Sequence, residues 1–202
     1  MKIIFEGKII DRETTDLDMF VMDFVDFLHE AKINYVIVSG YVSILFGRSR
    51  LSEDIDVILE KLDKNRFNSL WSIVIKDFEC LNTQNKEEAY TEYISKSHAI
   101  RFSRKGKYIP NIELKFPSTD LDNWSLENKK ESMIDGKKLC ISSLELQIAF
   151  KFFLGSEKDI EDAKYLYILF KELLDKELLD GFLQQLRQEE NFKRYINESP
   201  RH

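Results

Sequence analysis

Glycine and proline are scarce in this 202-residue sequence, which has seven glycines and three prolines. Because both residues interrupt regular structure, their scarcity predicts long helices and strands rather than a loop-rich chain. Cysteine is scarcer still: Cys80 and Cys140 lie far apart, without His or Cys neighbours at metal-ligand spacing. This argues against a cysteine-based metal site and indicates two reduced thiols in a cytoplasmic protein.

Long apolar runs and a basic charge balance are also absent. No apolar stretch reaches the roughly 20 residues that a membrane-spanning helix needs, and the opening MKIIFEGKIIDRETT has no run long enough for a signal peptide. The formal net charge is -6, whereas a protein that coats long nucleic acid is usually basic. We therefore expect a cytoplasmic protein without a membrane partner. If it handles phosphates, metal ions or local Arg and Lys must offset the repulsion.

The hydrophobic pattern predicts an α/β (α+β) fold. A mixed β-sheet flanked by helices is expected in residues 1–138, including a helix near the N-terminus, and a C-terminal helical bundle in 139–202. Ser142, with Glu145 three residues later, resembles a capping box at the start of that bundle. The predicted strands are 35–38, 54–59, 99–103, 108–116 and 138–141, and the predicted helices are 15–31, 41–46, 66–76, 143–154, 157–171, 176–188 and 189–197.

Two acidic residues, Asp54 and Asp56, interrupt an otherwise apolar strand. Side chains alternate along a strand, so these two point the same way, about 6–7 Å apart, while Ile55 and Val57 point into a core. Two like charges on a half-buried strand are costly unless a cation lies between them. A hard divalent cation such as Mg²⁺, shared with substrate phosphates, suits carboxylate oxygens best. On an exposed strand the same tripeptide would carry no function.

The residues ahead of the acid pair suit phosphate. Ser39-Gly40 ends one strand and opens a short helix, where glycine permits close backbone approach and the helix start favours anions. Ser52 adds a hydroxyl, and Arg48 and Arg50 add positive charge for phosphate oxygens.

A third acid, Glu113, lies in the apolar strand IPNIELKF. If this strand lies beside residues 54–59, Glu113 would face Asp54 and Asp56. The alternative is that Glu113 and Lys115 are solvent-facing residues of a hairpin.

This order of parts resembles the opening motif of the nucleotidyltransferase (polymerase beta-like) superfamily. That motif is a hydrophobic residue, Gly-Gly or Gly-Ser, a short gap and Asp-x-Asp; here Val38-Ser39-Gly40 and Asp54-Ile55-Asp56 match it, with Ser39 replacing the first glycine. Within the superfamily, residues 50–56 are similar to AbiEii-type minimal enzymes of toxin–antitoxin systems. The resemblance spans roughly residues 35–170. It implies a nucleotidyltransferase-type sheet, with Glu113 as the third acid.

A second part of the resemblance lies in the helical region. The AbiEii-type enzymes carry a lysine on one helix and a Lys-Asp-x-x-Asp motif after it, matched here by Lys151 and by Lys158, Asp159 and Asp162. The resemblance assigns these four residues to nucleotide binding. The alternatives are that Lys151 is a surface lysine and that the two aspartates only cap and solvate a helix.

The resemblance implies a metal-assisted transfer of a nucleoside monophosphate from a nucleoside triphosphate, with ATP among the candidates. Asp54, Asp56 and Glu113 would be catalytic and would hold Mg²⁺ or Mn²⁺. Ser39, Gly40 and Ser52 would hold the outer phosphates, while Arg50 and Lys151 would neutralise the leaving pyrophosphate. The acceptor stays open: a tRNA end, a protein hydroxyl or a small molecule.

Two other functions compete with this one. The chain could be an antitoxin-like binding protein that masks a partner, or an inactive fold retained for protein interaction. Because all three acids are present, we favour an active enzyme. Arg101, Arg104, Lys105 and Lys107 are expected in a solvated turn rather than at a nucleic-acid acceptor. Most of the aromatic residues in the helical region are expected in the core rather than on a base-stacking surface; they are Phe150, Phe152, Phe153, Tyr165, Tyr167 and Phe170.

Overall fold

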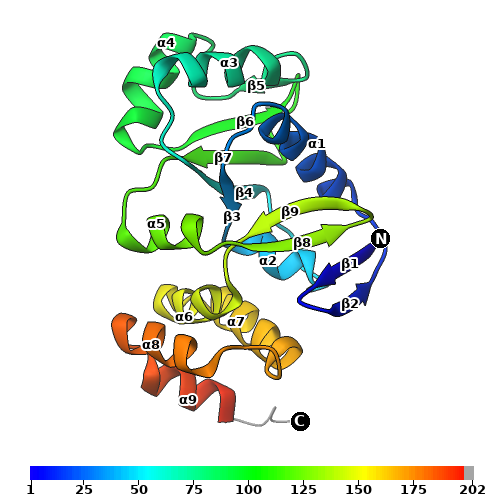
Figure 1. Cartoon of the computed structure of the whole chain (residues 1–202), viewed down its shortest axis with the longest axis vertical. Helices are drawn as coiled ribbons and strands as arrows, with labels where there is room; N and C mark the ends of the chain where they lie inside the picture. Colours follow the sequence, from blue (N-terminus) through cyan, green and yellow to red (C-terminus); the bar gives the residue numbers. More distant parts are fainter. Residues whose placement is uncertain (198–202) are drawn as a thin grey trace.

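The computed structural model describes residues 1–197 and builds them around one mixed sheet (Figure 1). Within these residues the strand order is β2-β1-β8-β9-β3-β4-β7-β6-β5. Only two strand pairs are parallel, β3 with β9 and β4 with β7. The strands are β1 Lys2–Phe5, β2 Lys8–Asp11, β3 Tyr35–Ile37, β4 Asp54–Leu59, β5 Phe78–Cys80, β6 Ile100–Arg104, β7 Asn111–Lys115, β8 Lys130–Ile134 and β9 Lys137–Ile141.

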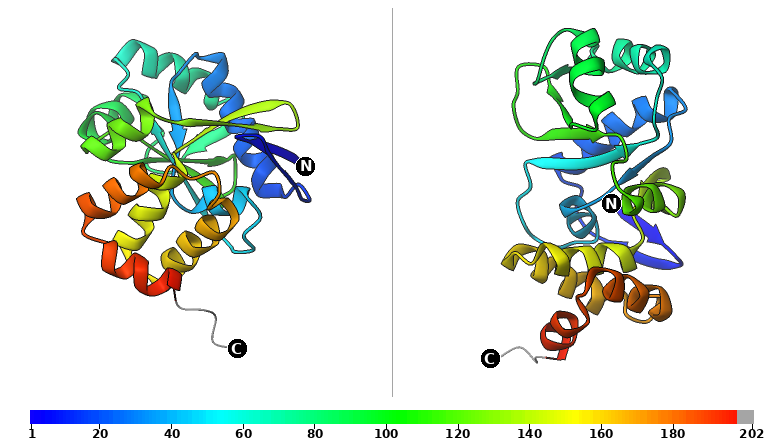
Figure 2. Two further views of the ribbon diagram at one scale, coloured as in Figure 1. Left: turned by 60° about the horizontal axis from the view of Figure 1, so that its bottom comes forward. Right: turned by 90° about the vertical axis from the view of Figure 1, so that its left-hand side faces the viewer.

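The last helices gather at one end of the sheet, as Figure 1 and the right-hand view of Figure 2 show. The helices are α1 Asp16–Glu30, α2 Gly40–Leu45, α3 Lys64–Val74, α4 Lys86–Glu88, α5 Asp120–Glu127, α6 Leu144–Leu154, α7 Glu157–Phe170, α8 Lys176–Leu186 and α9 Glu189–Asn197. A π-turn at Ala89–Tyr93 and a 3-10 turn at Ile94–Lys96 follow α4. In this described part of the chain, no helix combines the length and apolarity needed to cross a membrane.

The two faces of the sheet are covered differently. On one face, Phe24 of α1 packs against Phe78 of the edge strand β5 and Phe102 of its neighbour β6, and Trp71 of α3 also contacts Phe102. On the other face, a small cluster joins Val36, Ile58 and Leu126 of α5. Ile58 shares its face with Asp54 and Asp56, because all three lie at alternate positions of β4. The acids therefore point to the face of the sheet that α5 covers, next to the apolar cluster of Val36, Ile58 and Leu126.

The predicted fold class is confirmed: a mixed sheet flanked by helices, followed by helices α6–α9. The division between residues 138 and 139 stays a prediction, and it falls inside β9. Residues 198–202, the end of the predicted helical region, lie outside the described residues.

The capping prediction for α6 is wrong by one residue. Ser143, not Ser142, is the N-cap, and its hydroxyl accepts from Leu146 N. Glu145 is buried and accepts instead from the amide of Asp175, which ties the start of α6 to the start of α8. Because Glu145 binds the start of α8, its side chain does not take part in capping α6.

Candidate functional site

The strand of Glu113 lies beside the strand of the acid pair, as expected. β4 and β7 run parallel, with Asp54 paired to Asn111 and Asp56 paired to Glu113. Paired residues of neighbouring strands project from the same face of a sheet. The register therefore brings three acids and one amide to a single face, on two neighbouring strands inside the sheet.

Asp56 is the acid with the most perturbed environment. Burial raises the pKa of its carboxyl above the ordinary aspartate value, and the charge of Asp54 raises it further. A hydrogen bond with the Ser39 side chain and the positive charges of Lys115 and Lys151 oppose that rise. A carboxylate in this position is stabilised by any additional cation that reaches it.

Asp54 is more exposed and is oriented by its neighbours. Asn111 Nδ2 donates to Asp54 Oδ1 at 2.6 Å, and Ser52 Oγ donates to the backbone oxygen of Asp54 at 3.0 Å. The other amide atom, Asn111 Oδ1, is buried and accepts no hydrogen bond. Asn111 was not among the predicted site residues, although its position two residues before Glu113 places it on the same face.

Glu113 points to the acids' face but already has a partner. Arg101 Nε, on β6, donates to Glu113 Oε1 at 2.6 Å. Among residues 1–197, no three His, Cys, Asp or Glu side chains come together closely enough for a metal site. The three predicted ligands thus share a face without converging on one point.

The turn before α2 holds Ser39 in a conformation that suits glycine better. Ser39 has φ 64° and ψ −137°, where a side chain is strained. Its amide donates to Oε1 of Gln147, a buried residue of α6, at 3.0 Å. The superfamily motif places glycine here. The chain keeps serine, whose backbone is held from the helical region and whose hydroxyl contacts Asp56.

Gly40 leaves room for the guanidinium of Arg50. A Cβ on Gly40 would lie 1.9 Å from Arg50 Nη2 and 3.5 Å from Ser52 Oγ. The guanidinium therefore lies flat against the turn, in the space that a side chain at position 40 would fill. The close approach to Gly40 seen in the structure is made by Arg50 of this chain, and the approach of a phosphate stays a prediction.

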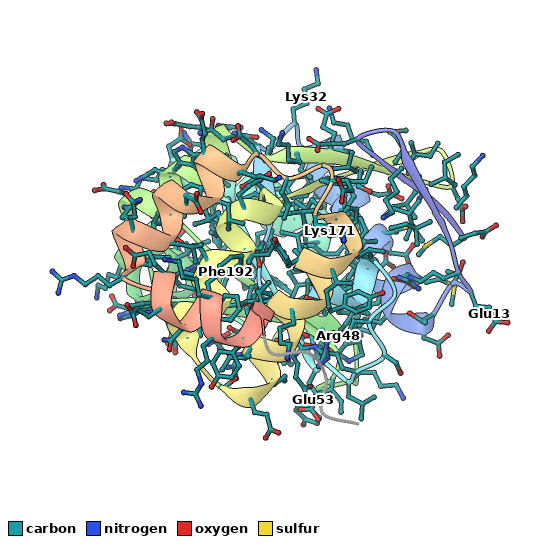
Figure 3. The ribbon with its side chains drawn as sticks, turned by 90° about the horizontal axis from the view of Figure 1, so that it is seen from below. Glu13, Lys32, Arg48, Glu53, Lys171 and Phe192 are labelled. Atoms are coloured by element: carbon teal, nitrogen blue, oxygen red, sulfur yellow. The ribbon has the colours of Figure 1, made fainter. Side chains whose placement is uncertain are left out.

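A buried charge cluster lies behind that turn. Asp162 is fully buried, and Lys151 Nζ donates to its Oδ2 at 2.7 Å. Arg48 Nε is 2.9 Å from Asp162 Oδ1, and Arg50 Nη1 is 3.4 Å from Oδ2. Figure 3 shows Arg48 beneath α7, to which it is also bound through Glu161. The alternative that Lys151 is a surface lysine is therefore wrong.

The rest of the Lys-Asp-x-x-Asp motif is divided. Asp159 Oδ1 lies 3.5 Å from Lys151 Nζ, and its other oxygen accepts from Ser156, the N-cap of α7. Lys158 is exposed on the first turn of α7. The structure therefore brings Asp159 to the cluster together with Lys151 and Asp162, and leaves Lys158 in solvent.

Arg50 carries unused hydrogen-bonding capacity. Its side chain is 9% exposed. Its buried Nε has no hydrogen-bond acceptor, and its buried Nη1 faces only the Asp162 carboxylate, at 3.4 Å. A buried guanidinium is costly when its N–H groups lack acceptors. The Nη2 atom is the one that lies at the turn formed by Ser39 and Gly40.

Two cavities adjoin the acids. One, of about 360 Å³, is bordered by Ser39, Lys115 and Gln147, and its walls include the half-exposed rings of Phe150 and Phe153. Of the aromatic residues expected mostly in the core, Phe152 and Phe170 are buried there, whereas Phe150 and Phe153 line this cavity. The other cavity, of about 440 Å³, is lined by Glu53, Asp54, Leu81, Asn82, Arg101, Tyr108, Ile109 and Asn111.

The fold that carries this site is that of nucleotidyltransferase-like proteins. One similar structure is an antigenic nucleotidyltransferase-like protein from Paracoccidioides brasiliensis. The alignment covers 90% of this chain and 93% of that protein, with a TM-score of 0.53 and 19% sequence identity. A second is ANT(2")-Ia in complex with adenylyl-2"-tobramycin. Here the alignment covers 86% of this chain and 98% of that protein, with a TM-score of 0.53 and 12% sequence identity. No protein-family model and no curated protein matches the sequence. At these identities the likeness establishes the fold, and the similarity to AbiEii-type enzymes stays a prediction.

Proposed function

We propose that the chain is a nucleotidyltransferase that moves a nucleoside monophosphate from a nucleoside triphosphate to a hydroxyl acceptor. One observation carries the proposal: the parallel register of β4 and β7 sets Asp54, Asp56 and Glu113 on one face. The Ser39–Gly40 turn contacts that face through the Ser39 hydroxyl. The acids that would hold a metal and the turn that would hold phosphate are therefore connected by the contact between Ser39 and Asp56.

The acids suit Mg²⁺ or Mn²⁺ as a cofactor. All three offer carboxylate oxygen, the ligand type that these ions prefer, and burial makes Asp56 favour a nearby cation. The unpaired Oδ1 of Asn111 adds an oxygen beside Asp54. We assign the metal to Asp54 and Asp56, with Glu113 joining them once it leaves Arg101. When bound, the ion neutralises charge on the reacting phosphate.

The nucleotide would lie along α6. The candidate phosphate donor is Arg50, because its Nη2 lies against the Gly40 turn. Ser52 lies against the same turn. Lys151 contributes through the cluster behind Arg50 rather than by direct contact, since Asp162 takes its ammonium group. The 360 Å³ cavity would take the base and sugar, with Phe150 and Phe153 as its aromatic wall.

The reaction would exchange one phosphorus–oxygen bond for another. The acceptor oxygen forms a bond to the α-phosphorus, while the bond from that phosphorus to the bridging oxygen breaks and pyrophosphate leaves. The proton of the acceptor hydroxyl passes to a carboxylate, for which Glu113 is the candidate. Arg50 would stabilise the charge that develops on the leaving phosphates.

For the acceptor we favour a small molecule over a tRNA end or a protein hydroxyl. The 440 Å³ cavity that includes Asp54 has the volume of a small-molecule pocket. ANT(2")-Ia, which shares the fold, was solved with adenylyl-2"-tobramycin, a nucleotidylated small molecule. The role in a toxin–antitoxin pair and the cytoplasmic location remain predictions.

The test uses the four triphosphates, each labelled at the α-phosphate, with Mg²⁺ and separate acceptor pools of small hydroxyl compounds, tRNA and protein. The parent chain is expected to label one pool, and Asp56→Asn is expected to label none while keeping its circular dichroism. Asp180→Asn, an exposed residue of α8, is the matched control and should label as the parent does.

Two results would reject the proposal. If Asp56→Asn labels an acceptor at the parental rate, the acid pair does not take part in the reaction. Calorimetry that detects no binding of any triphosphate with Mg²⁺ would favour the non-catalytic binding protein instead.

A further inference from the structure

Arg101 and Glu113 form an ion pair next to the acid pair. β6 runs antiparallel to β7 with these two residues opposite each other, and the Nε–Oε1 distance is 2.6 Å. The Arg101 side chain is 52% exposed and the Glu113 side chain 19%. An ion pair with this much solvent contact is weak and opens readily.

The backbone of Arg101 is fixed, whereas its side chain is able to leave. Its amide donates to Asn82 Oδ1 at 2.7 Å, and its carbonyl accepts from Leu81 N at 2.8 Å. Only side-chain torsions must change for the guanidinium to release Glu113. β6 and β7 stay in register while this happens.

Arg101 also lines the 440 Å³ cavity together with Asp54, Tyr108 and Asn111. A molecule that enters this cavity therefore contacts the guanidinium. The same residue touches the third acid on one side and the proposed acceptor space on the other, and so links the two.

We propose that Arg101 is a positioning residue that keeps Glu113 away from Asp54 and Asp56 until an acceptor enters this cavity. The proposal rests on the proposed function, because it assigns Glu113 to the same oxygen set. An acceptor that contacts Arg101 draws the guanidinium off Glu113, and the freed carboxylate turns to the acid pair. Such coupling limits the loss of nucleotide to water when no acceptor is present.

The first test measures Mn²⁺ affinity of the full chain by electron paramagnetic resonance, without nucleotide or acceptor. Arg101→Ala is expected to bind Mn²⁺ about two- to fivefold more tightly than the parent, because Glu113 becomes free. Arg101→Lys keeps a cation that can pair with Glu113 and is expected to bind as the parent does. Equal affinity of Arg101→Ala and the parent overturns the proposal.

A double-mutant cycle separates this role from a general effect of charge, since removing any nearby cation strengthens metal binding. The gain from Arg101→Ala is expected to vanish when Glu113 is already Gln. A gain of the same size in the Glu113→Gln background overturns the proposal. Circular dichroism verifies that each variant is folded.

A second readout is hydrolysis of the triphosphate without acceptor. Arg101→Ala is expected to release more nucleoside monophosphate than the parent, and an unchanged rate counts against the coupling. Asp56→Asn distinguishes the two proposals: parental Mn²⁺ binding by this variant defeats the proposed function itself. If Asp56→Asn loses Mn²⁺ and Arg101→Ala gains none, only the role of Arg101 is rejected.

Discussion

Replacing Lys151 with methionine tests whether this lysine belongs to the buried structure of the helical region. Its ammonium group is buried and donates to Asp162, which has no exposed surface. Removing one partner of a buried ion pair costs about 3–5 kcal/mol, because the other charge stays buried. Asp162 keeps Arg48 at 2.9 Å, so we expect the lower end, about 3 kcal/mol. Methionine preserves most of the packing volume.

Thermal unfolding followed by circular dichroism measures this loss. In a chain of this size, about 3 kcal/mol lowers Tm by about 6–12 °C. Lys158→Met is the matched control: Lys158 is exposed in the same motif, so its free energy of unfolding should stay within about 0.5 kcal/mol. Combining Lys151→Met with Asp162→Asn should cost less than the sum of the two changes. A loss below about 1 kcal/mol for Lys151→Met would refute the buried ion pair.

Three further predictions concern the turn and the acid pair. Gly40→Ala places a Cβ 1.9 Å from Arg50 Nη2, so the guanidinium must move; we expect triphosphate binding to weaken by about tenfold or more in calorimetry. Ser39→Val should lower the free energy of unfolding in urea by about 1–3 kcal/mol because φ is 64°, whereas Ser39→Gly should stay within about 1 kcal/mol of the parent. Equal costs for both variants would show that the backbone is unstrained. Burial raises the pKa of Asp56 in the folded chain, so its protonated form favours folding; this contribution is present at acid pH and is lost as pH rises through the raised pKa. Metal-free Asp56→Asn should therefore unfold at a higher Tm than the parent at neutral pH. The Mn²⁺ affinity of the parent should fall on acidification. A lower Tm for Asp56→Asn than for the parent would contradict the burial of this charge.

Strong local patterns were sufficient for much of the fold. β4 occupies residues 54–59 as predicted, and α1, α6 and α7 begin and end within about two residues of their predicted bounds. Each of these three helices has apolar residues at helical spacing and a polar N-cap. The sequence of α5, by contrast, has few apolar positions and predicts no helix.

Short strands at and near the edges were missed for a different reason. β1 and β2 form a hairpin of four residues each, whose turn at Glu6 and Gly7 has positive φ at both positions. Gly7 was an available hairpin signal, but the exposed Ile9 made β2 look unpatterned. β5 has only three residues. Such strands are stabilised by their neighbours in the sheet, which a local pattern does not reveal.

The site shows the same limit. Strand alternation placed Asp54 and Asp56 on one face, and a parallel neighbour brought Glu113 there. What alternation could not supply is the choice of partner: Arg101 for Glu113, and Asp162 for Lys151. These contacts join residues 12 and 11 positions apart, and only the packed chain determines which of several nearby charges each will meet.

The bond from Ser39 to Gln147 has a consequence for how the chain could be divided. The Ser39 amide is held by the side chain of Gln147, which follows the last strand, so a fragment ending at Ile141 would keep Asp54, Asp56 and Glu113 but lose this hydrogen bond. Exchanging α6 for the corresponding helix of another nucleotidyltransferase-like protein would therefore change how that turn is held, while Asp54, Asp56 and Glu113 stay in place.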